Sequence, residues 1–281
     1  MTLRRHSQWG SITKHLLLLV GGVVMIYPLL WMISSSFKPQ NLIFAQMGLW
    51  PTQFTLENYT KGWNAIGVPF GVFFVNSFVI SVAAVVGNVA SCSLAGYAFA
   101  RLDFKMKGFW FSMMLVTMML PFHVTLIPRY ILFFKLGWLN TFLPLTVPHF
   151  LAVDSFFVFL IVQFIRGLPR DLDEAAAIDG ASEFRIFWQV IVPLATPALV
   201  TTAIFTFIWS WDNFFSQLLY LSKVPLYTVP LGLRAFVDST DKSSYGSLFA
   251  MSVLSLVPAF VIFVSAQQQL VEGVSRTGLK G

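Results

Sequence analysis

Strongly apolar blocks alternate with shorter polar stretches along the whole chain. Six blocks approach the length of about 20 residues that a membrane-spanning helix needs. They cover residues 16–33, 73–99, 108–128, 143–165, 197–221 and 248–270. The pattern predicts an all-α integral membrane protein whose six transmembrane helices form one domain over residues 1–281. The stretch 34–69 between the first two blocks is mixed in composition, and we expect a loop with little regular structure there.

The longest polar-rich interruption, residues 171–193, predicts two short helices joined by a turn. Its first helix would begin with acidic residues, which a helix N-terminus favours. Gly180 suits the turn because glycine reaches positive φ without a Cβ clash. Ser182 can cap a second helix, and the apolar pattern of that helix stops before Pro193. A surface hairpin that merely connects two spans fits this pattern as well.

Composition supports the membrane class and excludes others. Hydrophobic residues make up 57% of the chain and charged residues 11%, whereas soluble domains carry about 25% charged residues. The net charge of +6 does not indicate nucleic acid, because the basic residues are spread among loop ends. Cys92 is the single cysteine, so no internal disulfide is possible. No Walker phosphate loop occurs, so we expect no ATP hydrolysis, catalytic residue, cofactor or metal site in this chain.

Basic residues orient the spans. Eleven of the 18 Lys and Arg residues fall on the side that holds both termini and the 171–193 stretch, and seven fall on the other side. By the positive-inside rule, both termini and this stretch face the cytoplasm. The block 16–33 exceeds the hydrophobic region of about 7–15 residues in a signal peptide. We therefore expect a retained first span, with a cleaved signal peptide as the alternative.

Two carboxylates fall inside apolar blocks, Asp154 in the fourth and Asp212 in the fifth. An ionisable group in hydrocarbon is costly, so each is a functional candidate. Asp154 could instead lie in water near the outer end of its span. Aromatic and amide groups surround Asp212, and together they suit a sugar, whose hydroxyls need hydrogen-bond partners. A packed aromatic helix is the alternative. The candidates for the substrate path are Trp209, Trp211, Asp212, Asn213, Gln217 and Asp154.

The spacing inside the polar stretch carries a family resemblance. Glu174-Ala-Ala is followed after three residues by Gly180, and after nine more by Val190-Ile-Val-Pro193. This resembles the Glu-Ala-Ala loop of ABC importer permeases, with valine twice in place of Ile and Leu. In that family the loop docks on a cytoplasmic ATPase. The resemblance implies this coupling role for Asp173, Glu174, Ala175, Ala176, Asp179, Gly180, Arg185 and Pro193.

Further segments resemble carbohydrate permeases of the maltose-importer kind. They are residues 49–51 (LWP), 55–59 (TLENY) and 209–214 (WSWDNF), where Asp212-Asn213 replaces the family's Asn-Glu. The resemblance implies the type I importer arrangement in the cytoplasmic membrane of a prokaryote. It also implies a paralogous permease, two ATPases that hold ATP and Mg, an extracytoplasmic substrate-binding protein and a carbohydrate substrate. A permease for amino acids, peptides or metals, a proton-coupled secondary transporter and a non-transporting scaffold remain as alternatives.

Overall fold

The computed structural model describes residues 8–238 and 245–278, and every regular element in these ranges is helical. The all-α prediction is confirmed. The chain divides into two compact units. One contains the residues up to Phe70 together with Leu233–Leu256, and the other contains Gly71–Gly232 together with the residues from Val257 onward. Each unit is described by itself below.

Apolar helices of membrane-spanning length are present as the pattern predicts. Four candidate spans are long and apolar enough: Thr13–Ser36, Phe70–Arg101, Leu143–Arg166 and Tyr245–Ser265. Two bent pairs of helices, Lys107–Met118 with Phe122–Lys135 and Glu183–Leu194 with Thr196–Trp211, bring the number to six if each pair is one span. The membrane helices therefore number four to six in the described residues.

The first unit contains a buried lysine just after the first span. It contains α1 (Gln8–Ser36), η1 (Gln40–Leu42), α2 (Glu57–Asn64) and the start of α14 (Tyr245–Gly278). Lys38 is 0% exposed, and its Nζ donates to the carbonyls of Gln46 at 2.8 Å and Gly48 at 2.6 Å. The side-chain amide of Asn58 donates to the carbonyls of Ser36 and Lys38, both at 2.8 Å. The stretch 34–69 thus has more regular structure than its composition suggests.

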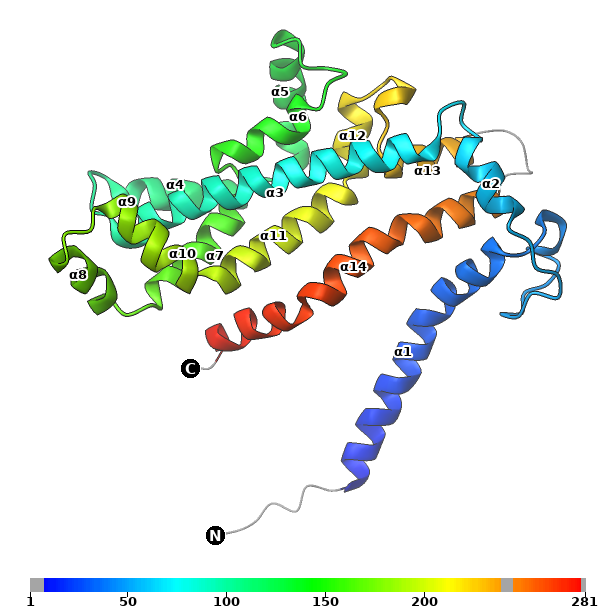
Figure 1. Ribbon diagram of the computed structural model, residues 1–281, viewed down its shortest axis with the longest axis horizontal. Coiled ribbons are helices and arrows are strands. Elements are labelled where there is room, and N and C mark those ends of the chain that lie inside the picture. Colours follow the sequence, from blue (N-terminus) through cyan, green and yellow to red (C-terminus); the bar gives the residue numbers. More distant parts are fainter. Residues whose placement is uncertain (1–7, 239–244, 279–281) are drawn as a thin grey trace. The chain divides into compact units, whose positions relative to one another are not determined.

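The core of the second unit forms where several helices pack along one half of α3 (Phe70–Arg101) (Figure 1). Gly96 allows the closest approach, since a Cβ there would lie 2.6 Å from the Ile161 Cγ2 atom. Small residues let helix backbones come together in a membrane. The packed helices are α4 (Lys107–Met118), α7 (Ser155–Arg166) and α11 (Thr196–Trp211).

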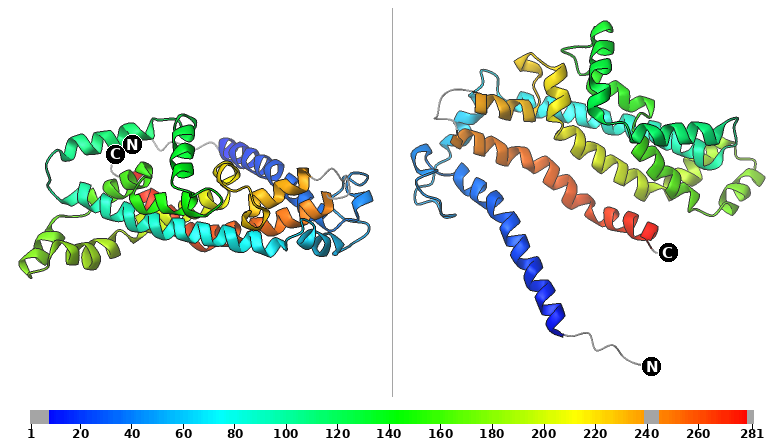
Figure 2. Two further views of the ribbon diagram at one scale, coloured as in Figure 1. Left: turned by 90° about the horizontal axis from the view of Figure 1, so that it is seen from above. Right: turned by 180° about the vertical axis from the view of Figure 1, so that it is seen from behind.

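Three of the expected spans contain breaks. The expected span 108–128 is helical only to Met118, and α5 (Phe122–Lys135) turns away by 101° (Figure 2). Pro121 has no N–H to continue the helix, and it restricts the residue before it. The expected span 143–165 breaks at Ala152, whose φ is +51°. The fifth breaks after Trp211. The elements around these breaks are α6 (Leu143–Thr146), η2 (Val147–Leu151), α12 (Phe214–Tyr220), η4 (Val224–Leu226) and α13 (Val229–Asp238).

Candidate functional site

The stretch 171–193 forms the helix–turn–helix that its sequence predicts, and we call it the 171–193 hairpin. α8 (Asp171–Ile178) leads to a turn in which Gly180 has a φ of +79°. The Oγ of Ser182 then accepts a hydrogen bond from the Arg185 N–H at 3.4 Å and caps the next helix. The elements after the turn are α9 (Glu183–Ile186), the π-helical turn η3 (Phe187–Ile191) and α10 (Val192–Leu194).

The end of the hairpin differs from the expectation that the helix stops before Pro193. The helical path continues through Pro193 to Leu194, where α10 ends. Pro193 stands in the first turn of α10. The first turn of a helix has no internal partner for its N–H groups, so a proline is tolerated there. The chain then bends by 76° into α11.

The two faces of α8 have different surroundings. Asp173 and Ala176 are half-buried, and Ala176 packs against the core that α3 and α7 share. Ile178 on the opposite side is 86% exposed. Phe184 and Trp188 are exposed in the same hairpin. The other predicted coupling residues, namely Glu174, Ala175, Asp179, Gly180, Arg185 and Pro193, are also exposed. The hairpin therefore offers a mixed apolar and charged surface.

The end of α3 clamps the hairpin at both of its helices. The Arg101 Nε lies 2.6 Å from the Asp173 Oδ2 atom in α8, and the two side chains are only 7% and 18% exposed. The Arg101 Nη2 also donates to the Leu168 carbonyl at 2.9 Å. One turn earlier on α3, the Tyr97 hydroxyl donates to the Glu183 Oε2 atom at 2.6 Å. A movement of the hairpin must therefore act on the end of α3.

Burial raises the pKa of Asp173 above its ordinary value, and the Arg101 and Arg170 guanidinium groups oppose this shift. The Oδ1 atom of Asp173 has no hydrogen-bond partner among the described residues. Because desolvation disfavours the charged form of a carboxyl group, Asp173 depends on Arg101 to stay ionised at its half-buried position. The ion pair is thus a sensitive point of the clamp.

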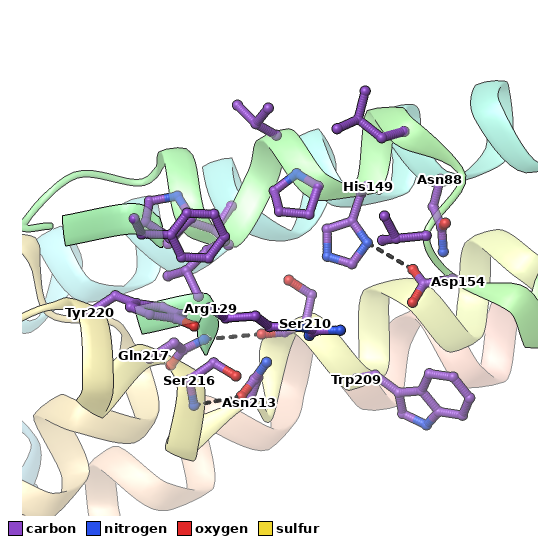
Figure 3. A pocket seen from close by; sticks show the side chains of 18 of the residues that line it. Asn88, Arg129, His149, Asp154, Trp209, Ser210, Asn213, Ser216, Gln217 and Tyr220 are labelled. Carbon is purple, nitrogen blue, oxygen red and sulfur yellow. Dashed lines mark hydrogen bonds and ion pairs between the residues drawn. The ribbon is translucent and has the colours of Figure 1, made fainter. Parts of the chain in front are cut away.

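A cavity of about 560 Å³ lies between α3, α5, the α6–η2 segment, α11 and α12 (Figure 3). Its volume falls in the usual range of small-molecule sites. Apolar residues such as Phe133 and Leu145 form part of the wall. Its polar lining consists of Asn88, Arg129, His149, Asp154, Thr206, Ser210, Asn213, Ser216, Gln217 and Tyr220. All of these residues belong to the second unit.

Hydrogen bonds fix several of the polar groups in the cavity wall. The His149 Nδ1 atom lies 2.9 Å from the Asp154 Oδ2 atom, across the break that separates η2 from α7. The Asn88 amide of α3 donates to the Thr206 hydroxyl of α11 at 2.8 Å. The polar wall is thus held by contacts between helices as well as within them.

The structure brings four of the six predicted substrate-path residues to this cavity. Asp154, Trp209, Asn213 and Gln217 line it. Gln217 is fully buried, with its amide nitrogen 3.0 Å from the Ser210 carbonyl and its amide oxygen bonded to the Thr228 hydroxyl. The Asn213 Oδ1 atom accepts from the Ser216 N–H at 3.1 Å and caps α12. Both amides therefore also shape the cavity wall.

The other two candidates lie outside the cavity lining. Trp211 is 2% exposed and stacks on Phe207 at a centroid distance of 5.6 Å. Asp212 is exposed at the break between α11 and α12. Residues along an unbroken helix change direction by about 100° each, so neighbours in sequence face different surroundings. This rotation separates Trp209, which reaches the cavity, from Trp211.

Sequence reasoning missed seven polar residues of the lining, namely Asn88, Arg129, His149, Thr206, Ser210, Ser216 and Tyr220. Arg129 lies between the third and fourth apolar blocks, where the sequence indicates a loop with a possible interfacial helix. No local signal indicates that this helix, α5, turns back over α12. The aromatic contacts of Phe133 and Tyr220, at 5.3 Å, bring them together.

The chain combines helices of membrane-spanning length with a polar cavity among them and an exposed hairpin clamped to α3. These features define a membrane transport protein. A family model described as "Binding-protein-dependent transport system inner membrane component" matches residues 87–276. The chain therefore belongs to this family, whose members are components of transport systems rather than enzymes. Membership implies a substrate-binding protein and an ATPase as partners, and a multi-pass location in the inner membrane.

Curated relatives resemble the chain over most of its length. A probable ABC transporter permease protein, YurM of Bacillus subtilis, is 31% identical and covers 99% of this chain and 91% of its own. The arabinooligosaccharide permease AraQ of Halalkalibacterium halodurans is 33% identical, with 92% of each chain covered. The trehalose/maltose permease MalG of Thermococcus litoralis is 32% identical and covers 96% of this chain and 99% of its own.

A solved structure has the same fold. A chain of a bacterial ABC transporter involved in the import of the acidic polysaccharide alginate matches with a TM-score of 0.85 and 19% identity. The match covers 96% of this chain and 99% of that chain. The expected importer-permease fold is therefore confirmed over almost the whole length.

Proposed function

We propose that this chain moves a sugar or an oligosaccharide through the cavity, as a permease subunit of an ATP-driven importer that works by alternating access. The observation that carries the proposal is the cavity itself, in which amide and hydroxyl groups lie beside aromatic rings among membrane helices. Sugars present hydroxyls that both donate and accept, and such a lining can match them. The names of the relatives AraQ and MalG, which specify oligosaccharides and trehalose or maltose, support this substrate class.

The 171–193 hairpin is the surface that docks on an ATPase in this proposal. Its exposed face combines Glu174 with the apolar Ile178 and Phe184. Exposed apolar side chains rimmed by polar groups are typical of a protein–protein contact. ATP and Mg bind to the ATPase subunits and not to this chain.

α3 provides a direct connection between the hairpin and the cavity. Arg101 holds the hairpin at the end of α3, and Asn88 lines the cavity on the same helix. The two residues are about 20 Å apart along the helix at 1.5 Å per residue. When the ATPases close, the hairpin moves with them and α3 moves as a rigid body, which alters access to the cavity.

The complete importer in this proposal contains more than one copy of such a chain. The cavity of this chain is one part of the path across the membrane in this proposal, and a paralogous permease completes the path. Two ATPases dock from the cytoplasm, and an extracytoplasmic binding protein delivers the sugar. Both termini and the 171–193 hairpin face the cytoplasm, where the basic residues are more numerous. The two compact units act together as one permease domain.

The experiment is uptake of labelled saccharides into proteoliposomes that contain the complete importer. We expect uptake that requires ATP and is unaffected when the proton gradient is collapsed. Uptake driven by a proton gradient without ATP would contradict the importer, and ATP-driven uptake of amino acids but no sugar would contradict the substrate class.

A charge reversal tests the docking surface separately. Glu174→Lys should release the ATPase when the solubilised complex is purified, because it reverses a charge on the exposed face of α8. Glu57→Lys is the matched control, since Glu57 is an exposed helical carboxylate that pairs with Lys61 at 2.6 Å in α2. Retention of the ATPase by Glu174→Lys would place docking elsewhere.

A further inference from the structure

The cavity contains a cationic side chain, that of Arg129. Arg129 projects from α5, and Figure 3 shows its side chain extending through the cavity between Tyr220 and Ser210. Its guanidinium carbon is 5.8 Å from the centre of the Phe122 ring, on the same helix. No carboxylate among the described residues lies within ion-pair distance of it. Arginine stays protonated in proteins, so the cavity holds a permanent positive charge.

The carboxylate of the cavity makes no ion pair with Arg129. Among the described residues that line the cavity, Asp154 is the only carboxylate, and its Oδ2 atom is engaged by the His149 ring at 2.9 Å. Figure 3 shows this pair at the opposite end of the cavity from Tyr220. Arg129 is exposed, so its guanidinium is accessible to a ligand that enters the cavity. The arrangement is therefore suited to a counter-charge brought by the cargo.

The groups around Arg129 fit the remainder of a saccharide. Asn213 and Ser216 bring amide and hydroxyl groups to the same part of the cavity, beside the buried amide of Gln217. The planar guanidinium matches a carboxylate with two parallel hydrogen bonds, a geometry that a neutral hydroxymethyl group cannot reproduce. The cavity volume of about 560 Å³ is large enough for a small oligosaccharide.

We propose that the cavity selects anionic saccharides, in which a sugar carboxylate binds Arg129 while the amide and hydroxyl groups bind the sugar hydroxyls. This inference rests on the proposed sugar-importer function and specifies its substrate class. Arg129 acts as a specificity-determining residue that contacts the substrate. Asp154 is engaged by His149 at 2.9 Å, whereas Arg129 makes no ion pair with any described residue and is available to the ligand.

The test compares two probes that differ in charge alone. The complete importer is placed in nanodiscs of phosphatidylcholine, which supplies no net anionic headgroup to Arg129. Binding of digalacturonate is measured by saturation-transfer NMR against the neutral disaccharide in which both carboxylates are reduced to hydroxymethyl groups. We expect wild type to prefer digalacturonate by about tenfold, since a hydrogen bond to a charged group is worth this much or more.

The variants locate the preference at one side chain. Arg129→Gln should lose the preference and still bind the neutral disaccharide, and Arg129→Lys should retain part of it. Lys135→Gln is the matched control, because it removes an exposed positive charge from the same helix outside the cavity lining. Equal binding of both probes to wild type, or an unchanged preference in Arg129→Gln, would overturn the anionic class while sugar binding stands. Binding of neither probe would contradict the sugar-binding cavity itself and, with it, this inference.

Adding anionic lipid distinguishes a second source of the counter-charge. If phosphatidylglycerol in the nanodisc abolishes the preference of wild type by competing for Arg129, the residue is a lipid-headgroup site and the proposal is wrong. An unchanged preference supports a site reserved for the saccharide.

Discussion

The clamp between α3 and the 171–193 hairpin gives a prediction whose size follows from the structure. Arg101→Met keeps much of the side-chain length while removing the guanidinium from Asp173 and from the Leu168 carbonyl. The Asp173 carboxylate then stays half-buried, with no counter-charge at contact distance. We expect the hairpin to detach from the end of α3 while the membrane helices stay folded, since their packing uses other residues.

The expected free-energy change follows from the burial of the Arg101–Asp173 ion pair, whose side chains are 7% and 18% exposed. Removing one partner of a buried ion pair costs about 3–5 kcal/mol, because the remaining charge is left unpaired. Each 1.4 kcal/mol is a factor of ten, so the open population of the hairpin should rise by about two to four powers of ten. Replacing both partners removes the unpaired charge, and Arg101→Met with Asp173→Asn should regain most of the docking.

The docking of the hairpin in Arg101→Met should depend on pH, and the direction of this dependence follows from the pKa of Asp173. Burial already raises the pKa of Asp173, and removing Arg101 takes away a guanidinium that opposes the rise. A carboxyl group with a raised pKa in the docked state favours docking while it is protonated. Docking in Arg101→Met should therefore recover as the pH falls below the raised pKa of Asp173, and it should weaken as the pH rises through that value.

Hydrogen exchange of peptides that cover residues 171–186 is the measurement, combined with the amount of sugar imported per ATP hydrolysed. We expect faster exchange and a lower import ratio in Arg101→Met, and near wild-type values in the double variant. Lys105→Gln is the control, because it removes an exposed positive charge four residues away without touching Asp173. Unchanged exchange in Arg101→Met would refute the view that this ion pair holds the hairpin.

Two glycines give further predictions. A Cβ at Gly180 would meet nothing within 4 Å, so the cost of Gly180→Val is only the backbone strain at a φ of +79°, about 1–2 kcal/mol. Gly180→Val should therefore reduce ATPase capture in pull-downs more than Gly180→Asn. If Gly180→Val and Gly180→Asn reduce ATPase capture equally, backbone strain at residue 180 does not cause the loss of capture. Gly96→Ala should lower the stability by about 1–3 kcal/mol, because its Cβ would lie 2.6 Å from the Ile161 Cγ2 atom. Gly108→Ala should leave the stability unchanged, because a Cβ there would meet nothing within 4 Å. Equal melting temperatures for these two variants would show that α3 and α7 can separate at no cost.

Local signals along the chain were sufficient for the long apolar helices and for the hairpin. The apolar blocks predict α1, α3 and α14, because a long uncharged helix satisfies its own backbone hydrogen bonds in a membrane. The motif from Glu174 to Pro193 gave the hairpin because its turn depends on short-range features, a glycine with positive φ and a serine cap. The continuation of the helix through Pro193 was missed, since the same residue that ends a helix is accepted in a first turn.

The cavity depended on how distant segments fold back on one another. Asp154, Trp209, Asn213 and Gln217 were found from their polarity and from their place in apolar blocks, but the same reasoning included Trp211 and Asp212, which lie outside the lining. The break after Met118, where the chain bends by 101°, changes the direction of the chain within what reads as a continuous span.

The sequence by itself therefore determined the membrane class, the long apolar helices and the hairpin, because each of these depends on neighbours within a few turns of the chain. Only the tertiary structure decided which polar residues share the cavity, and that Arg101 and Tyr97 hold the hairpin. Arg101 and Asp173 are 2.6 Å apart in space and far apart in sequence. Such a contact is set by the packing of α3 against α7 and the elements of the hairpin, and no local pattern encodes it.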